Sequence, residues 1–194
     1  MPVPWRIGRI GRIGWLEFDA TRLRRRQAGS ASLQRVDLRD GTNCRWRGVF
    51  GPMPYAGDIS CREGWKILVD HPKAQLVDVR TAAEWNFVGL PLLDTLAREP
   101  ILIEWQRYPD MALNADFVAM LESELNKRGV ARDVPLLFLC RSGARSQSAA
   151  VAMQAAGYAL AYNIAGGFEG ARDDNGRRAA VEGWKHDALP WMQR

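Results

Sequence analysis

A cysteine between two arginines is the part of this sequence best suited to chemistry: Cys140 is followed by Arg141, Ser142, Gly143, Ala144, Arg145 and Ser146. The four residues before Cys140 are apolar, which is typical of a buried strand in a parallel sheet. An alanine-rich run over residues 145–156 predicts a helix that ends at Gly157. The turn between strand and helix, the helix N-terminus and the two guanidinium groups all favour a negative charge on the sulfur. We therefore expect Cys140 to be a thiolate nucleophile, reachable from solvent and held in a ring of main-chain N–H groups.

The alternative for any strand cysteine is a buried, unreactive thiol, because cysteine is among the residue types most often buried. The arginines and the glycine that follow Cys140 favour the reactive interpretation. Cys61 differs, because it lies in the first turn of a helix that the capping-box spacing of Ser60 and Glu63 predicts, and no such loop follows it. We interpret Cys61 as structural.

A second strand is predicted over residues 74–79, and charged residues gather at its end. Asp78 and Arg80 are expected to form a structural clamp there. Thr81 is expected to cap a short helix, and the i, i+4 spacing of Arg80 and Glu84 predicts that these two side chains pair.

Strands that alternate with helices along the chain predict an α/β fold with a parallel sheet, in which ligands bind beyond the carboxyl ends of the strands. Asp78, Glu104 and Cys140 all fall at predicted strand ends, so they can meet at one edge. The residues that follow Glu104 either line the rim of a pocket or pack into the core: Trp105, Gln106, Arg107 and Tyr108.

The segment from Cys140 to Ser146 resembles the active-site loop of rhodanese-like sulfurtransferases. Other motifs of that family agree in order and spacing: Leu76-Val77-Asp78-Val79-Arg80 with Glu84-Trp85, Tyr162-Asn163-Ile164-Ala165-Gly166-Gly167-Phe168, Gly183-Trp184 and Leu189-Pro190-Trp191. The resemblance covers residues 55–194 and implies a rhodanese-like fold, a parallel β-sheet flanked by helices on both faces. It also implies that Asp78 and Arg80 support the loop. Many relatives carry His-Ile-x-Gly-Ala where this chain has Phe87-Val88-Gly89-Leu90-Pro91, so no role of that histidine can be transferred.

The resemblance implies a sulfurtransferase that moves a sulfane sulfur from a donor such as thiosulfate to a nucleophilic acceptor through a Cys140 persulfide. The backbone of residues 141–145 would cradle the persulfide, and Arg141 and Arg145 would attract the donor. The substrate-binding residues would thus be Arg141, Ser142, Gly143, Ala144 and Arg145. The implied partners are a small anionic sulfur donor and a thiol or protein acceptor, and no metal or organic cofactor is needed.

Three other functions stay open. Cysteine phosphatases need an arginine six positions after the cysteine, but here that position is Ser146 and Arg145 comes one residue early. A non-catalytic or regulatory module that binds partners or senses sulfur would keep the same fold. Delivery of sulfur to RNA would rest only on the arginine-rich N-terminal segment and would predict salt-dependent RNA binding.

The net charge of +5 is unevenly distributed along the 194 residues. Residues 1–50 hold eleven arginines and four acidic residues, a net +7, whereas residues 51–194 hold sixteen basic and eighteen acidic residues, a net −2. We therefore divide the chain into a basic, disordered N-terminal extension, residues 1–54, and a rhodanese-like domain, residues 55–194. Because the domain itself is not basic, nucleic acid is not expected as its partner.

The cysteine count and the hydropathy pattern indicate the compartment. Three cysteines with no close pairing, Cys44, Cys61 and Cys140, argue against a disulfide framework and favour a reducing, cytoplasmic environment. No apolar stretch approaches the ~18 residues that a membrane span needs, so no membrane partner is expected. The histidines lie far in sequence from any cysteine, so no metal site is expected either.

Overall fold

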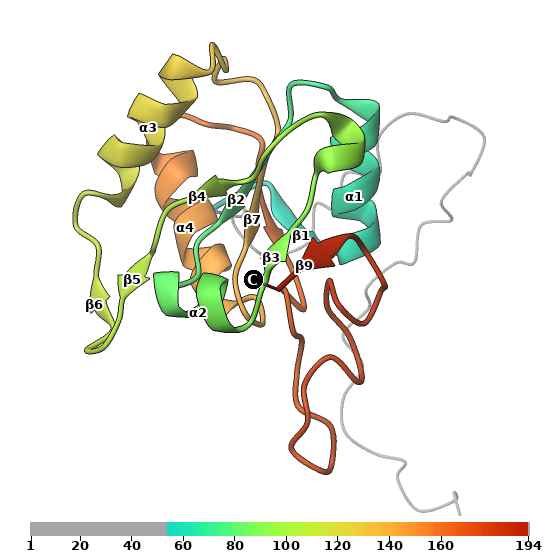
Figure 1. Ribbon diagram of the computed structural model, residues 1–194. Helices are drawn as coiled ribbons and strands as arrows, with labels where there is room; N and C mark the ends of the chain where they lie inside the picture. The colour runs from blue at the N-terminus through green and yellow to red at the C-terminus, as the bar shows by residue number, and fades with distance from the viewer. Residues whose placement is uncertain (1–53, 194) are drawn as a thin grey trace, which may run out of the picture. The chain divides into compact units, whose positions relative to one another are not determined.

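A parallel five-stranded sheet forms the centre of the part of the chain that this computed structural model describes, residues 54–193 (Figure 1). Its strands lie in the order β1 (Gly57–Ile59), β8 (Ala161–Ile164), β7 (Leu136–Leu139), β2 (Gln75–Asp78) and β4 (Ile101–Leu102). All four neighbouring pairs are parallel. The strand that precedes Cys140 is thus the middle one, with a partner on each side.

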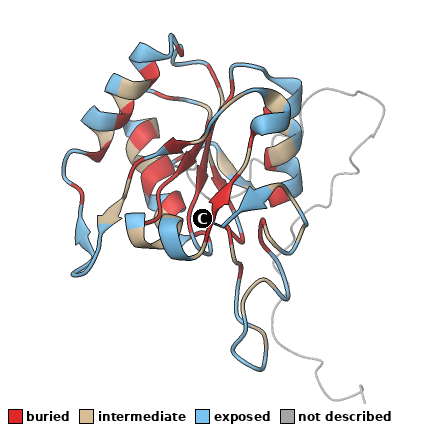
Figure 2. Ribbon diagram, viewed as in Figure 1, coloured by how far each residue is buried: buried red, intermediate tan, exposed pale blue. Residues whose placement is uncertain are grey.

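Side chains of β7 alternate between two cores, as the pleat of a strand requires. Leu136 and Phe138 are buried in a core that includes residues of α3 (Phe117–Lys127) and α4 (Ala144–Ala155). Leu137 and Leu139 are buried on the other face with residues of α1 (Cys61–Asp70). Figure 2 shows the resulting pattern, in which the inner strands of the sheet, β8, β7 and β2, are mostly buried and the helices expose their outer sides. The predicted parallel sheet with helices on both faces is confirmed.

Two helices begin at the capping boxes that the sequence contains. Before α1, the Ser60 hydroxyl accepts from the Glu63 N–H at 3.2 Å, and the Glu63 carboxylate accepts from the Ser60 N–H at 2.8 Å. Before α2 (Ala82–Phe87), Thr81 and Glu84 make the same reciprocal pair, at 3.2 and 2.9 Å. Each box satisfies donors that a helix N-terminus leaves without a partner.

Several short elements of the structure are not predicted from the sequence. β1 precedes the first predicted helix. Antiparallel pairs join β3 (Leu90–Pro91) to β9 (Trp191–Met192) and β5 (Gln106–Arg107) to β6 (Ala112–Leu113), and a 3₁₀ turn spans Asp94–Leu96. Strands of two or three residues are too short to show a periodicity, so only their tertiary partners define them.

The C-terminal segment packs onto the domain. Trp184 is fully buried in the α1 core, and β9 pairs with β3. Within residues 54–193, no helix has the length and apolar character needed to cross a membrane. Apart from Pro54, the predicted basic extension, residues 1–54, lies outside the described residues.

Candidate active site

Cys140 lies at the junction of β7 and α4, at the floor of a pocket. Its sulfur accepts hydrogen bonds from the Gly143 N–H and the Ser146 hydroxyl, each at 3.1 Å. The Ser146 Oγ also lies 3.0 Å from the Gly143 carbonyl oxygen, so two acceptors share its one proton. Gly143 has a φ of +100°, a conformation that glycine adopts without strain, and it directs its N–H back towards the sulfur. Two donors at the N-terminus of a helix stabilise negative charge on the sulfur.

The surroundings of the sulfur differ from the expected ring of N–H groups in two ways. Among residues 54–193, only one main-chain N–H, that of Gly143, donates to the sulfur, and Cys140 is 1% exposed. The N–H groups of Arg141, Ser142, Ala144 and Arg145 have no acceptor among residues 54–193. Ala144 and Arg145 lie in the first turn of α4, where N–H groups have no partner within the helix, and Arg141 and Ser142 lie in the loop before it. These four donors remain free for an atom bound to the sulfur.

The segment after β8 forms main-chain hydrogen bonds with the Cys140 loop. The N–H of Phe168 donates to the Cys140 carbonyl at 2.7 Å, and the N–H groups of Glu169 and Gly170 donate to the Arg141 carbonyl at 3.0 and 3.2 Å. In a trans peptide the C=O and the following N–H point in opposite directions. The N–H groups of Arg141 and Ser142 therefore point away from this segment. The hydrogen bonds from the segment to the two carbonyl groups thus fix the orientation of the loop backbone.

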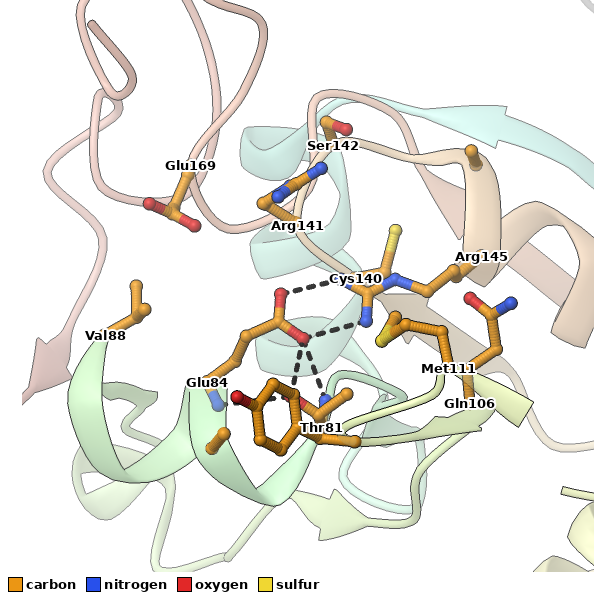
Figure 3. Close-up of a pocket in the computed structure, with 13 residues that line it drawn as sticks. Thr81, Glu84, Val88, Gln106, Met111, Cys140, Arg141, Ser142, Arg145 and Glu169 are labelled. Atoms are coloured by element: carbon orange, nitrogen blue, oxygen red, sulfur yellow. Dashed lines mark hydrogen bonds and ion pairs between the residues drawn. The ribbon is translucent and has the colours of Figure 1, made fainter. Parts of the chain in front are cut away.

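Glu84 and Arg145 form a bidentate ion pair beside the pocket (Figure 3). The Arg145 guanidinium donates to the two carboxylate oxygens at 2.8 and 2.7 Å. Burial alone would raise the pKa of Glu84, but hydrogen bonds from Arg145 and Thr81 outweigh it and lower the pKa to about 2. The predicted pairing of Glu84 with Arg80 is therefore wrong. Arg145, expected to attract the donor, already uses two of its terminal N–H groups on Glu84.

Asp78 and Arg80 form a fully buried pair outside the pocket lining. The Arg80 Nε donates to Asp78 Oδ1 at 2.9 Å and its Nη2 donates to the Gly89 carbonyl at 2.8 Å. The guanidinium also lies over the Phe168 ring, 3.9 Å from its centroid, in a cation–π contact. Since Phe168 binds the Cys140 carbonyl, Arg80 is connected to the loop through one residue, in keeping with a supporting role.

The pocket above Cys140 has a volume of about 530 Å³. Its lining comes from α2, from the hairpin of β5 and β6, from the Cys140 loop and from Glu169 (Figure 3). The lining residues are Thr81, Ala83, Glu84, Val88, Gln106, Tyr108, Met111, Cys140, Arg141, Ser142, Ala144, Arg145 and Glu169.

Some residues expected near this edge have other roles. Glu104 lies outside the lining and accepts from the Ala82 N–H at 2.7 Å, at the start of α2. Of the residues that follow it, Gln106 and Tyr108 line the pocket. Trp105 stacks edge-on against Phe117 with ring centroids 5.0 Å apart, and Arg107 donates to the Asn114 side chain.

The sequence reasoning missed Ser146, Met111 and Glu169. Ser146 is fully buried and donates to the sulfur, and its position six residues after Cys140, in the first turn of a predicted helix, was the signal that could have identified it. Nothing local marks Met111 or Glu169, because the fold brings them to the pocket from distant segments. Cys61 lies outside this pocket with its sulfur 3.4 Å from the Gly167 carbonyl oxygen, and burial, with Asp187 and Glu182 nearby, raises its pKa to about 12.

One protein-family model matches more than half of this chain. The family model described as the rhodanese-like domain matches residues 62–174, a span that includes Cys140, both arginines and the Phe168 segment. The chain belongs to the rhodanese-like domain family.

Similar proteins align with this chain over nearly their whole length. The uncharacterized protein RC0915 of Rickettsia conorii is 39% identical over 135 residues, which are 70% of this chain and 96% of that protein. The uncharacterized protein RP600 of Rickettsia prowazekii is 37% identical over the same shares of both chains. Among solved structures, the crystal structure of Rv0390 from M. tuberculosis is 46% identical, with a TM-score of 0.66 over 72% of this chain and 99% of that one.

Proposed function

We propose that this rhodanese-like protein is a sulfurtransferase that carries a sulfane sulfur as a persulfide on Cys140. The observation that carries the proposal is the position of the Cys140 sulfur, which accepts from the Gly143 N–H and the Ser146 hydroxyl at 3.1 Å at the floor of an open pocket. A thiolate held in this way is a nucleophile ready for covalent catalysis.

The reaction has two steps, and thiosulfate serves as the simplest donor. In the first, the Cys140 thiolate attacks the outer sulfur of thiosulfate, a new S–S bond forms, and the donor S–S bond breaks with its electron pair leaving on sulfite. In the second, an acceptor nucleophile attacks the outer sulfur of the Cys140 persulfide and restores the thiolate. With cyanide as acceptor the product is thiocyanate.

The loop supports this chemistry through its free donors. The N–H groups of Arg141, Ser142, Ala144 and Arg145 have no other acceptor among residues 54–193, so they can stabilise the persulfide anion. Arg141 lines the pocket and can meet a negatively charged substrate.

The natural acceptor is a thiol or a protein. We propose a cytoplasmic location, and the free thiols of Cys61 and Cys140 support a reducing compartment.

The test is a steady-state assay of thiocyanate formation from thiosulfate and cyanide with the full-length chain. We expect turnover in the wild type and a loss to background in Cys140→Ala, while Cys61→Ala keeps its activity. A protein that forms no thiocyanate from any sulfane donor, or in which Cys140→Ala changes nothing, would refute the proposal. A chain that accepts sulfur but never passes it on would instead be a sulfur-sensing module.

A further inference from the structure

The charged residues that line the pocket cancel one another. Two arginines face two glutamates, and the pair of Arg145 and Glu84 is closed by two hydrogen bonds of 2.8 and 2.7 Å. The other two, Arg141 and Glu169, make no side-chain hydrogen bond or ion pair within residues 54–193. The lining therefore offers one free cation and one free anion, in contrast to the two free arginines that the sequence suggests.

Within residues 54–193, Lys185 and Arg178 are further cations near these groups, and both lie outside the pocket lining. Lys185 is hydrogen-bonded to the Val88 carbonyl at 2.8 Å, and Arg178 to the Gly170 carbonyl at 2.5 Å. Neither side chain lines the cavity. The charged side chains of the lining therefore present no net positive charge to a dianion that approaches Cys140.

The mouth of the pocket is apolar. We call Ala83, Val88, Tyr108 and Met111 the apolar rim; they come from α2 and its end and from the β5–β6 hairpin. Tyr108 is 68% exposed and Met111 38% exposed. Figure 3 shows Val88 on one side of the opening and Met111 on the other, beside Arg145. The volume of about 530 Å³ lies in the range that holds organic ligands and exceeds what a small inorganic anion needs.

On the basis of the sulfur transfer proposed above, we propose that the preferred donor is an organic hydropersulfide, R–S–SH, whose carbon chain lies on the apolar rim. The Cys140 thiolate attacks the outer sulfur, the donor S–S bond breaks, and the products are the Cys140 hydropersulfide and the thiolate R–S⁻. Such a donor brings at most one charge at its sulfur, which suits a lining with balanced charges. Its hydrocarbon part covers apolar surface that thiosulfate leaves exposed to water.

The test compares how fast two donors load Cys140 of the full-length chain. Thiosulfate and isolated benzyl hydropersulfide are each mixed with the protein, quenched by alkylation after increasing times, and the mass of the Cys140 peptide is measured. Each rate is divided by the rate at which the same donor transfers sulfur to free cysteine. We call this quotient the enhancement. We expect the enhancement to be at least about tenfold larger for benzyl hydropersulfide than for thiosulfate, which is the discrimination that an apolar pocket can supply.

Two variants test the cause of the preference. Met111→Gln should lower the enhancement ratio of benzyl hydropersulfide to thiosulfate by about fivefold, whereas Met120→Gln, an exposed methionine of α3 outside this pocket, should not change it. Glu169→Gln leaves a free cation in the lining and should also lower the ratio, by speeding thiosulfate. Its control is Glu99→Gln, the same charge change at an exposed residue outside the lining.

The outcomes separate the two proposals. An enhancement for thiosulfate equal to or above that for benzyl hydropersulfide overturns the organic donor and leaves the sulfurtransferase proposal intact. A ratio that Met111→Gln and Glu169→Gln do not change also overturns it, because the preference would then have another origin. If neither donor loads Cys140, the proposed function itself fails.

Discussion

Gly167 lies directly against the carbonyl group of Cys140. A Cβ atom at position 167 would be 2.4 Å from that carbonyl oxygen and 2.7 Å from the Ser142 nitrogen. Gly167 also has a φ of +60°, in the left-handed region. This close approach lets the next residue, Phe168, donate to the same carbonyl at 2.7 Å. The orientation of the Cys140 loop therefore depends on the absence of a side chain at position 167.

Gly167→Ala should displace the Cys140 loop. We expect a loss of at least about 2 kcal/mol in the free energy of unfolding, from the left-handed backbone and the overlap together, and a large loss of sulfur transfer. Urea denaturation and the thiocyanate assay measure the two effects. Gly176→Ala is the control, because Gly176 has a φ of +76° but no atom within 4 Å of an added Cβ. It should lose only about 1 kcal/mol and stay active, and equal effects of the two variants would contradict the account.

Ser146→Ala should slow the loading of Cys140 without unfolding the protein. The variant removes the hydroxyl that donates to the sulfur at 3.1 Å. A hydrogen bond to a charged group contributes about 1.5 kcal/mol, so we expect the loading rate to fall about tenfold. The control is Ser148→Ala in the same helix, whose hydroxyl bonds the Ala144 carbonyl and does not contact the sulfur. A loading rate in Ser146→Ala equal to that of the control would show that the hydroxyl has no part in the reaction.

The ion pair of Glu84 and Arg145 should make stability depend on pH in acid. The pKa of Glu84 lies at about 2 in the folded protein, against an ordinary value of 4.5, so the unfolded chain takes up the proton first as the pH falls. The stabilisation is complete above pH 4.5 and is lost as the pH falls towards 2. At neutral pH we expect Glu84→Gln, which can still cap α2, to be about 2 kcal/mol less stable than the wild type.

Urea denaturation of both proteins over a pH series checks this prediction. The difference in unfolding free energy between wild type and Glu84→Gln should narrow steadily as the pH falls below 4.5. A difference that stays constant down to the acid transition would mean that the carboxylate charge does not contribute.

Asp78→Asn should be strongly destabilising, because it leaves the Arg80 charge without its buried partner. Both side chains of this pair are fully buried. Breaking such a pair costs about 3–5 kcal/mol, whereas an exposed ion pair contributes below about 1 kcal/mol. Asp70→Asn, which removes the exposed partner of Lys66, is the matched control. Thermal or urea unfolding of the two variants gives the comparison, and a similar small effect in both would exclude Asp78 as a structural clamp.

The features that could be predicted from the sequence are those whose partners lie close along the chain. The Ser60 and Thr81 capping boxes join residues three positions apart, and the apolar run before Cys140 and the alanine-rich run after it define a strand and a helix without reference to the rest. The sheet follows from the alternation of such elements.

Partners across the fold could not be predicted in this way. The i, i+4 spacing predicts a pair of Arg80 and Glu84, but this rule holds inside a helix, and Arg80 precedes the cap residue Thr81 and is not helical. The Arg80 side chain donates to Asp78 and lies over the Phe168 ring. Glu84 instead pairs with Arg145, which is 61 residues away in the sequence. The sequence therefore predicts the nucleophile, while the charge balance of its pocket depends on the tertiary structure.

Mass spectrometry of the full-length protein, after treatment with a sulfane donor and alkylation, tests most directly whether Cys140 carries the sulfur. We predict one added sulfur on the peptide that contains Cys140, its removal by cyanide, and no such addition in Cys140→Ser. A Cys140 peptide that stays unmodified with every donor, or an added sulfur that maps to Cys61 instead, would contradict the account.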